Sequence, residues 1–460
     1  MSLHPLDWII IVGFFVFQAY LGFHSRCQQR GVMDAADYLL GGRRLTLPVF
    51  VASLVSTWYG GILGVGEYSF RYGISNWVVF GLPYYIWALV FAIFLARRAR
   101  RTHFISLPDH LGAAYGRGPA LVGAAVVFVM TVPAAYVLMM GDLARMLLNW
   151  PTWVGISLSA LLSITYLVTG GFRSSVRVDV LQFVCMFGGF ALIIPFAIHQ
   201  YGGWSFITQN VPATHLTWHG GNSGWYIASW YFIAAATLVE PAFYQRCYAT
   251  ENEALARRGI LWSIVFWIIF DFMTTTAGLY ARAVLVALPD PQTSYPALAI
   301  RVLPPGICGL FFVGVIATVI STVDSYMFIS ATALGRDLLS RLRPLTDRGV
   351  KAATRWALPA SAVLAIILAV GSRSVIALWR DLGSIGVPIM LLPILTTFTR
   401  RFRRPHAAYV IAWMLIPGLV ATFWIATRIA TKHYPLGLQP IFPALAVSIA
   451  FTIGLLRKKP

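Results

Sequence analysis

The stretch Ala317-Thr318-Val319-Ile320-Ser321-Thr322-Val323-Asp324-Ser325 lies inside a long apolar run from about residue 306 to 334. In a helix, one face of this stretch carries hydroxyl side chains at i, i+3, i+4 and i+7, namely Thr318, Ser321, Thr322 and Ser325. The carboxylate of Asp324 lies beside that polar stripe. The stretch therefore predicts a membrane helix with one polar face.

Two interpretations of the stripe remain open. Each hydroxyl can bond back to the carbonyl one turn earlier, as is common for Ser and Thr in helices. Alternatively, the stripe and Asp324 face an ion path, because an acid inside a membrane helix usually faces a cavity, an ion path or a partner. Hydroxyl and carboxylate oxygens are the ligands that small hard cations prefer. We therefore expect a transporter in which this helix packs against a broken one.

The composition indicates a membrane protein. The chain has 460 residues, of which 58% are hydrophobic and 11% charged. A soluble protein of this length carries about twice that charged fraction. Apolar runs of about 20 residues recur along the whole chain, which is the signal of transmembrane helices. The four cysteines show no metal or disulfide spacing and read as small buried residues: Cys27, Cys185, Cys247 and Cys308.

The net charge of +19 does not indicate nucleic-acid binding. The basic residues lie in short runs between apolar segments, such as residues 97–101 and 400–404, which is the positive-inside pattern. Such runs also favour the anionic head groups of a lipid bilayer. The pattern places the N-terminus outside and the C-terminal Arg457-Lys458-Lys459 in the cytoplasm of a cell (inner) membrane protein. No cleavable signal peptide is evident at the start of the chain.

We expect an all-α polytopic protein with about 13 transmembrane helices. The candidate spans are 6–24, 46–70, 74–96, 118–148, 152–170, 178–199, 223–248, 259–286, 306–334, 355–371, 374–399, 406–427 and 436–456.

Two of these spans carry helix breakers in their interior. The second contains Ser56-Thr57-Trp58-Tyr59-Gly60-Gly61, and the seventh contains Glu240-Pro241. Paired glycines also serve close helix packing, which is the alternative for the second span. Two breaks five spans apart predict a five-plus-five inverted repeat, a common architecture of secondary transporters. A further break is expected at Ser384-Ile385-Gly386-Val387-Pro388, in the eleventh span.

The domain division follows from the repeat. We expect a single transporter domain over residues 1–460: a leading helix and linker over 1–45, a first repeat over 46–199, a second repeat over 223–399 and two C-terminal helices over 406–460. The first repeat contains acidic residues within its expected spans. Asp142 and Arg145 are spaced to pair, and Asp179 is either an ion or gating residue or a charge at a helix start.

Six short motifs give the chain a family resemblance. It resembles the sodium:solute symporter family in the motifs Asp37-Tyr38-Leu39-Leu40-Gly41-Gly42-Arg43, Ser106-Leu107-Pro108-Asp109-His110-Leu111, Thr169-Gly170-Gly171, Asp179-Val180-Leu181-Gln182, Gln245-Arg246 and Ala317 to Ser325. The resemblance implies a leucine-transporter-like fold and symport of a small organic solute with Na⁺ as the coupling ion.

The resemblance also implies ion sites. A principal Na⁺ site would lie between the first broken helix and the helix of the opening stretch, with ligands from Ser56, Tyr59, Thr318, Ser321 and Thr322. The first three would supply backbone carbonyls and the last two hydroxyls. A second Na⁺ site, present in some members, would lie at Asp179, Asp324 and Ser325.

Solute is expected against the two breaks. The positions implied are Trp58, Gly60, Gly61, Glu240 and Phe243, with Tyr59, Tyr136 and Trp230 as further candidates. A carboxylate such as Glu240 needs a proton, a protein cation such as Arg380, or a cationic solute beside it. The nearby aromatic residues suit an amine or quaternary ammonium through cation–π contacts. A protonated or salt-bridged structural Glu240 is the alternative.

Other functions are kept as alternatives. These are a membrane sensor or receptor of the same fold without transport, and a proton-coupled solute transporter. The chain has no Walker-type nucleotide motif. An intramembrane enzyme is not expected, because no catalytic or metal constellation gathers in the sequence around its scattered acids Glu67, Asp142, Asp271 and Asp381.

Overall fold

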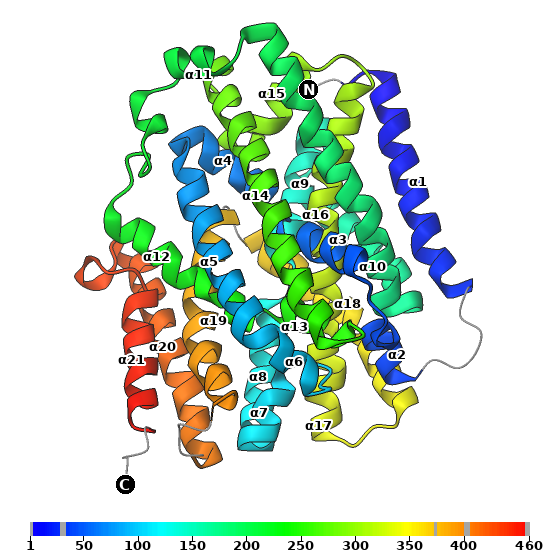
Figure 1. Cartoon of the computed structure of the whole chain (residues 1–460), viewed down its shortest axis with the longest axis vertical. Coiled ribbons are helices and arrows are strands. Elements are labelled where there is room, and N and C mark those ends of the chain that lie inside the picture. Colours follow the sequence, from blue (N-terminus) through cyan, green and yellow to red (C-terminus); the bar gives the residue numbers. More distant parts are fainter. Residues whose placement is uncertain (1–2, 28–33, 372–374, 400–404, 456–460) are drawn as a thin grey trace.

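The computed structural model describes residues 3–27, 34–371, 375–399 and 405–455. Within these ranges the chain is a bundle of helices, and its β-type pairing is one isolated bridge between Leu45 and Thr250. The N-terminus lies at the upper end of the bundle and the C-terminus at the lower end (Figure 1). The expected all-α class is confirmed. Two basic segments, 400–404 and 457–459, lie outside the described residues.

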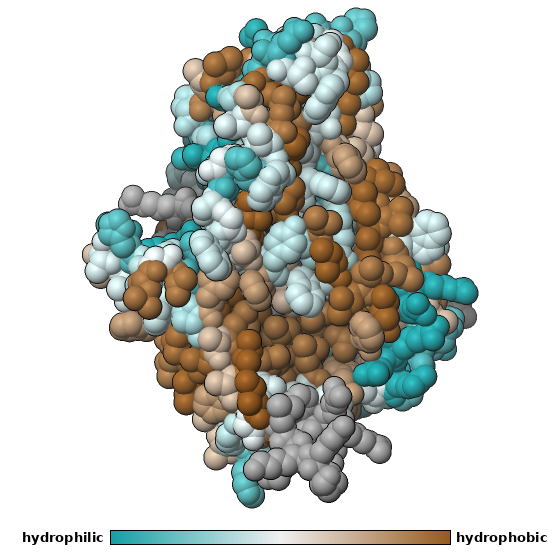
Figure 2. All heavy atoms as spheres, turned by 60° about the vertical axis from the view of Figure 1, so that its left-hand side comes forward, coloured by the Kyte–Doolittle hydropathy of each residue, from teal (hydrophilic) through white to brown (hydrophobic). Residues whose placement is uncertain are grey.

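The helices have the length and surface of a membrane protein. In the described ranges nine helices are long and apolar enough to cross a membrane, and a broken pair makes a tenth span. On the face that Figure 2 shows, apolar side chains cover much of the middle and lower part, while hydrophilic ones gather at the upper end and in patches on both flanks. An apolar flank of this kind is stable in lipid rather than in water, because a soluble protein rarely exposes so large an apolar surface.

The first part of the chain forms ten α-helices. They are α1 Pro5–Cys27, α2 Ala35–Leu40, α3 Leu47–Trp58, α4 Ile62–Tyr72, α5 Leu82–Val90, α6 Ala96–Arg101, α7 Pro108–Tyr115, α8 Arg117–Met130, α9 Ala134–Leu148 and α10 Thr152–Tyr201. Two π-helical turns, η2 (Trp77–Gly81) and η3 (Phe91–Leu95), extend α5 at both ends into one span.

The second part forms eleven. They are α11 Trp204–Asn210, α12 Gly224–Ala234, α13 Pro241–Ala249, α14 Glu253–Val284, α15 Ser294–Val302, α16 Ile307–Thr332, α17 Ser340–Leu342, α18 Asp347–Gly371, α19 Val375–Thr397, α20 Ala407–Thr431 and α21 Ile441–Ile453.

The expected spans map onto these helices with two differences. Helix α10 covers both the fifth and the sixth expected spans, and the two are separated at Gly171, whose φ of 57° and ψ of −141° are not helical. A Cβ at this position would lie 2.5 Å from the carbonyl oxygen of Tyr38, so only glycine fits there. The last expected span corresponds to α21, which is only 13 residues long. The count of 13 spans is therefore approximate.

Both expected breaks near the centre of the bundle are present. Helices α3 and α4 meet at an angle of 59° across Tyr59, Gly60 and Gly61. The second break lies between α12 and α13, where the 3₁₀ turn η5 (Ala235–Val239) leads to an extended Glu240 with a ψ of 114°. Pro241 then begins α13, a position that suits proline because the first helical residue needs no amide hydrogen.

The break expected at residues 384–388 is wrong. Helix α19 runs without interruption from Val375 to Thr397, with Pro388 and Pro393 inside it. Membrane helices tolerate interior prolines where neighbouring helices help to satisfy the backbone groups that the ring leaves free. Here α19 packs against α20 and α21, and Ser448 of α21 adds a hydrogen bond to the Pro388 carbonyl, at 2.9 Å, so neighbouring helices hold this segment in place.

The stretch that opened the sequence analysis lies in the most buried long helix of the described part. In the most apolar segment of the span that contains α16, 89% is buried inside the protein. The same fraction is 28% to 56% for the other unbroken candidate spans. Helix α16 packs against α10, α1, α18, α3 and α9. The interface with α3 brings the polar stripe to the first break. Cys247 and Cys308 are buried, as expected from the sequence, whereas Cys185 is only partly buried.

Candidate ion and solute site

The polar stripe of α16 faces the end of α3. The Ser321 hydroxyl donates hydrogen bonds to the carbonyl oxygens of Ser56, at 2.7 Å, and of Thr318, at 3.0 Å. The Thr322 hydroxyl donates to the carbonyl oxygen of Thr57, at 2.6 Å. Helix α3 ends at Trp58, so its last carbonyls are not all used within the helix. The break thus exposes backbone oxygens to the hydroxyls of α16.

Gly60 makes this close approach sterically feasible. A Cβ on Gly60 would lie 2.0 Å from the Thr322 hydroxyl oxygen, a distance that no side chain could adopt. Tyr59 is the residue that follows α3, and its phenol donates a hydrogen bond to Asp271 of α14. The paired glycines therefore serve both the break and the packing against α16.

The back-bonding interpretation holds for one hydroxyl and fails for another. Thr318 donates to the carbonyl of Gly314, four residues earlier in α16, at 2.6 Å. Thr322 bonds only across to α3, and Ser321 does both. The oxygens of Ser56, Thr318, Ser321 and Thr322 therefore meet in one buried place, with Thr57 as an additional carbonyl. This donor set consists of neutral oxygens and fits a hard cation.

A buried arginine occupies the next polar layer, toward α13 and α10. The Arg246 guanidinium donates hydrogen bonds to the hydroxyls of Ser325 at 2.7 Å, Thr57 at 2.9 Å and Ser53 at 3.1 Å. It forms an ion pair with Asp179 at 3.6 Å, and both side chains are completely buried. Ser53 in turn donates to the Asp179 carboxylate at 2.6 Å. A guanidinium with this many partners has a fixed orientation.

The alternative that Asp179 is a charge at a helix start does not hold. Asp179 lies in the interior of α10, eight residues after the Gly171 kink, and is fully buried. Its partners come from α3 and α13. Asp179 therefore joins three helices in the middle of the bundle.

Asp324 faces a different group of side chains. One of its oxygens accepts hydrogen bonds from the Tyr166 hydroxyl and from the Gln182 amide, the latter at 3.4 Å. Gln182 also donates to Gln18 of α1 at 3.3 Å. In the described ranges no ion pair joins Asp324 to a basic residue. The three residues expected at a second Na⁺ site are thus divided between the Arg246 cluster and the Tyr166 cluster.

A cavity of about 190 Å³ lies against both breaks. Five of the expected solute residues line it: Trp58, Tyr59, Gly61, Tyr136 and Glu240. Its other lining residues are Val65, Phe80, Tyr84, Met130, Val132, Ala135, Ile233, Ala236, Asp271, Tyr326, Trp379, Leu382 and Gly383.

Three expected solute residues, Gly60, Phe243 and Trp230, lie outside this lining. Gly60 faces Thr322, as described above. Phe243 is fully buried behind Trp58, with ring centroids 5.1 Å apart. Trp230 is also fully buried and packs on Phe80 at 4.7 Å. Phe243 and Trp230 therefore pack behind the residues that line the cavity and do not line it themselves.

The cavity contains two acids. Glu240 caps α13 by accepting a hydrogen bond from the Ala242 amide at 3.4 Å. Asp271 of α14 accepts hydrogen bonds from the phenols of Tyr59 and Tyr85, one on each carboxylate oxygen. Within the described part of the chain, no lysine, arginine or histidine forms an ion pair with either acid.

Arg380, the expected protein partner of Glu240, is engaged elsewhere. Its guanidinium pairs with Asp381 at 3.2 Å, and Asp381 also pairs with Arg428 at 2.9 Å. Asp381 therefore holds two arginines at once. Of the three compensations considered for Glu240, the protein cation is not Arg380.

Aromatic rings form much of the cavity wall. Trp58 contacts Tyr84 edge to face at a centroid distance of 5.6 Å, and Tyr136 contacts both Tyr326 at 5.4 Å and Trp379 at 6.4 Å. Trp379 approaches the first break closely, since a Cβ on Gly61 would lie 1.8 Å from its ring. Aromatic rings and two acids thus line the same cavity, a combination of groups that suits a cation.

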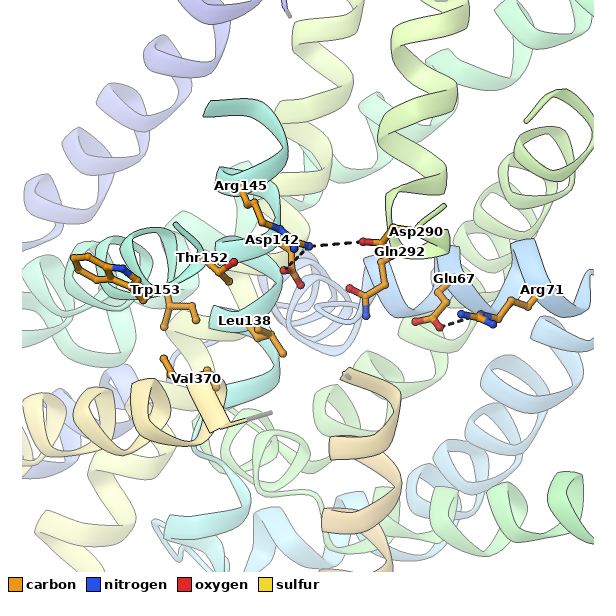
Figure 3. Close-up of a pocket in the computed structure, with 12 residues that line it drawn as sticks. Glu67, Arg71, Leu138, Asp142, Arg145, Thr152, Trp153, Asp290, Gln292 and Val370 are labelled. Carbon is orange, nitrogen blue, oxygen red and sulfur yellow. Dashed lines mark hydrogen bonds and ion pairs between the residues drawn. The ribbon is translucent and has the colours of Figure 1, made fainter. Parts of the chain in front are cut away.

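A second, wider cavity of about 700 Å³ is lined by residues of α4, α9 and α10 (Figure 3). Its charged side chains are paired. Arg71 lies 3.0 Å from Glu67, and Arg145 lies 3.4 Å from Asp142 and 3.7 Å from Asp290. The expected pair of Asp142 and Arg145 is confirmed.

A polar cluster at the lower end ties α7 to the segment that follows α16. Arg336 contacts both Asp109 and Asp337 at 2.6 Å, and Arg341 also pairs with Asp109. Burial raises the pKa of Asp109, but these guanidiniums and the Ile105 amide outweigh it and bring the pKa below its ordinary value. Burial lowers the pKa of the neighbouring His110 to about 4, so the imidazole is neutral.

Several residues of the site were not selected from the sequence. Ser53 and Thr57 were missed, although they are four residues apart in an apolar helix and carry the same polar-stripe signal as α16. Asp271 was noted only as a scattered acid, and Arg246 only as part of a motif. The aromatic residues Tyr84, Tyr326 and Trp379 had no signal that separates them from core residues.

Comparison with known proteins agrees with this architecture. The sequence model of the Sodium:solute symporter family matches residues 38–410 of this chain. The chain is 25% identical to the sodium/pantothenate symporter of Escherichia coli (strain K12), over 91% of this chain and 89% of that protein. It is 24% identical to the human high affinity choline transporter 1, over 85% of this chain and 72% of the relative.

A solved structure has the same fold. A Na⁺-coupled sialic acid symporter in a substrate-bound outward-open state aligns with a TM-score of 0.78 and 17% identity, over 98% of this chain and 97% of that one. The relatives are transporters, which agrees with the expectation that this protein is not an enzyme. The chain is a multi-pass membrane protein that belongs to the sodium:solute symporter family.

Proposed function

We propose that this protein is a Na⁺-coupled symporter that takes up a small amine or quaternary ammonium solute by alternating access. Na⁺ would bind between α3 and α16, at the oxygens of Ser56, Tyr59, Thr318, Ser321 and Thr322. When bound, the ion supplies a positive charge that links the broken helix to α16. Ion binding drives the cycle only if its affinity differs between the outward-open and inward-open states.

The donor set supports the ion. The hydroxyls of Ser321 and Thr322 already point at carbonyls of α3, at 2.7 Å and 2.6 Å. A cation among these oxygens would be coordinated by the lone pairs of groups that now bond to one another. Both helices would then gain a common partner, which explains how an ion at this interface can bias the arrangement of α3.

One observation supports the proposal that the solute is a cation. Glu240 lies at the second break, lines an aromatic cavity and forms no ion pair with a basic residue of the described chain. A carboxylate in such a place needs a compensating charge. A cationic solute supplies it, and the ring faces of Trp58 and Trp379 add cation–π attraction worth about 0.5 to 2 kcal/mol each.

Asp271 adds a second acid to the same cavity. Its two oxygens each accept a hydrogen bond from a phenol, that of Tyr59 or of Tyr85. A cavity with two carboxylates disfavours an anionic solute, because like charges repel strongly where water is scarce. The relative named as a choline transporter is consistent with a quaternary ammonium solute.

The alternative is a protonated Glu240 with a neutral solute, which corresponds to proton coupling. The two cases differ in what the carboxylate does for affinity. If Glu240 acts as a counter-charge, it contributes through its negative charge. Glu240→Gln would then lower the affinity for a cationic solute by about 10- to 100-fold. A protonated Glu240 resembles glutamine, so the same substitution would change the affinity little.

The test is equilibrium binding of a solute panel to the purified protein in nanodiscs, at high and low Na⁺. The panel should hold choline, a primary amine, a diamine, a neutral amino acid and a carboxylate of similar size. We expect a cation to bind best to wild type and to lose affinity in Glu240→Gln. Glu253→Gln is the control, since Glu253 pairs with Arg101 at the surface. Preferred binding of a neutral or anionic solute would overturn the solute class.

Transport itself needs a separate measurement. Na⁺-dependent accumulation of the bound solute in liposomes distinguishes a symporter from a sensor of the same fold. Orientation is tested by cysteine labelling in cells. A cysteine placed within 201–222 should react with an impermeant reagent from outside, and one within 341–350 should not. The opposite labelling would invert the proposed topology.

A further inference from the structure

Arg246 lies where a second cation would bind. The hydroxyls of Ser53, Thr57 and Ser325 and the carboxylate of Asp179 converge on its guanidinium within 2.7 to 3.6 Å. These oxygens, from α3, α10 and α16, are of the kind that a small hard cation takes. Here they are held by a side chain of α13 that cannot lose its charge.

The second Na⁺ site expected from the sequence does not fit this arrangement. Asp179 and Ser325 are both ligands of the guanidinium, and Asp324 is turned toward Tyr166 and Gln182. An ion added beside Arg246 would bring two positive charges close together in a fully buried place. Such repulsion is costly where the dielectric constant is low.

We propose that Arg246 permanently fills the second cation position, so that each transport cycle binds one Na⁺. This inference rests on the proposed Na⁺ coupling and deepens it. The local pairing supports it, because the Asp179 carboxylate already has a cationic partner in Arg246, and both side chains are fully buried.

Thr57 connects the two cation positions. Its carbonyl accepts the Thr322 hydroxyl of the principal site, and its own hydroxyl accepts from Arg246. The guanidinium therefore fixes the last turn of α3 from one side, while the principal site holds it from the other. The Arg246 guanidinium therefore links α3, α10 and α16 as a bound ion would, and no ion from solution is needed for this.

The experiment counts bound Na⁺ by equilibrium binding of radioactive Na⁺ to the purified protein in nanodiscs, without solute. We expect wild type to saturate at one ion per chain. In Arg246→Gln the vacated position should take a second ion, and in Arg246→Gln/Asp179→Asn the count should return to one. The double variant also guards against misfolding, because removing both partners of a buried pair is far milder than removing one.

The outcomes separate this inference from the proposed function. Two ions bound to wild type, with one lost in Asp179→Asn, would overturn the inference and leave Na⁺ coupling intact. A folded Arg246→Gln that still binds a single ion would also overturn it. No Na⁺ bound to wild type would overturn the coupling itself. If Arg246→Gln does not fold, one ion in both wild type and the double variant supports the inference.

Discussion

Ser321 and Ser325 are one helical turn apart on α16, and both are buried, yet their surroundings differ in kind. Ser321 donates to two neutral carbonyls, those of Ser56 and Thr318. Ser325 accepts from the guanidinium of Arg246 at 2.7 Å. The hydroxyl of the first layer therefore bonds to backbone oxygens, whereas the hydroxyl of the second bonds to a basic side chain.

This difference explains what separates an exchangeable ion site from a fixed one. Neutral oxygens that bond to one another can release those bonds and accept an ion at modest cost, since each net hydrogen bond is worth about 1 kcal/mol. A buried ion pair such as Arg246 and Asp179 cannot be opened so cheaply, because breaking it leaves a charge without a partner. The layer around Ser321 is therefore the one expected to respond to Na⁺.

The largest effect is expected from Gly60→Ala. The added Cβ would lie 2.0 Å from the Thr322 hydroxyl oxygen and would force α3 and α16 apart. We expect Na⁺ binding to be lost, with an affinity at least about 100-fold lower, because several ligands move together. Equilibrium Na⁺ binding to the purified variant measures this.

The control for that variant is Gly188→Ala. Gly188 lies in α10, and a Cβ there meets no atom within 4 Å. Alanine in a helix interior stabilises by about 0.5 to 1 kcal/mol relative to glycine, so this variant should fold and bind Na⁺ normally. Wild-type Na⁺ affinity in Gly60→Ala would mean that the break does not contribute to the ion site.

The next effect is expected from Ser321→Ala and Thr322→Ala. Each removes one ligand oxygen from the layer of neutral oxygens. We expect the Na⁺ concentration for half-saturation to rise about tenfold, which corresponds to about 1.4 kcal/mol. Ser330→Ala is the matched control, since Ser330 is a buried residue of the same helix and donates to Phe128 outside the site. Two folded variants with unchanged Na⁺ dependence would remove the assignment.

The sequence predicted this layer well because its signals are local. The hydroxyl spacing of residues 318–325 fixes one face of a helix, and the two glycines after Tyr59 fix a break. The second break at Glu240 and Pro241 was likewise predicted by a helix breaker in an apolar run. In contrast, Pro388 behaved as an interior residue of α19, because neighbouring helices decide whether a proline breaks a membrane helix.

Asp324→Asn is expected to have an intermediate effect. Asp324 has no cation partner in the described structure, so its negative charge is free to attract Na⁺ at the neighbouring layer. Asparagine keeps an oxygen for Tyr166 but removes the charge, so the Na⁺ affinity should fall about fivefold, as for a charge acting through a partly polar medium. The ion count should stay at one. A fall of the count from one to zero would instead make Asp324 a direct ligand of the bound ion.

The layer around Ser325 could not be predicted in the same way. Asp179, Arg246 and Ser325 come from α10, α13 and α16, far apart in the sequence, and no spacing rule joins them. Their residue types were visible, but the same types suit an ion site or an ion pair. Only the tertiary packing decides whether these oxygens bind an arginine or an ion. The aromatic wall of the cavity near Trp379 likewise depends on packing between helices that are distant in the sequence.

The smallest effect on ion binding is expected from Ser325→Ala. The Ser325 hydroxyl accepts from Arg246 and bonds to the hydroxyl of Thr57 at 2.9 Å, so its loss leaves one guanidinium hydrogen with fewer acceptors. That should lower the free energy of unfolding by about 1 to 3 kcal/mol. The Na⁺ affinity, however, should stay within about twofold of wild type, since Arg246 still holds Asp179 and Ser53. Thermal unfolding and Na⁺ titration of the same preparation measure both quantities. A Ser325→Ala variant with wild-type thermal stability and a tenfold weaker Na⁺ affinity would reverse the comparison, because the hydroxyl would then serve an ion and not the arginine.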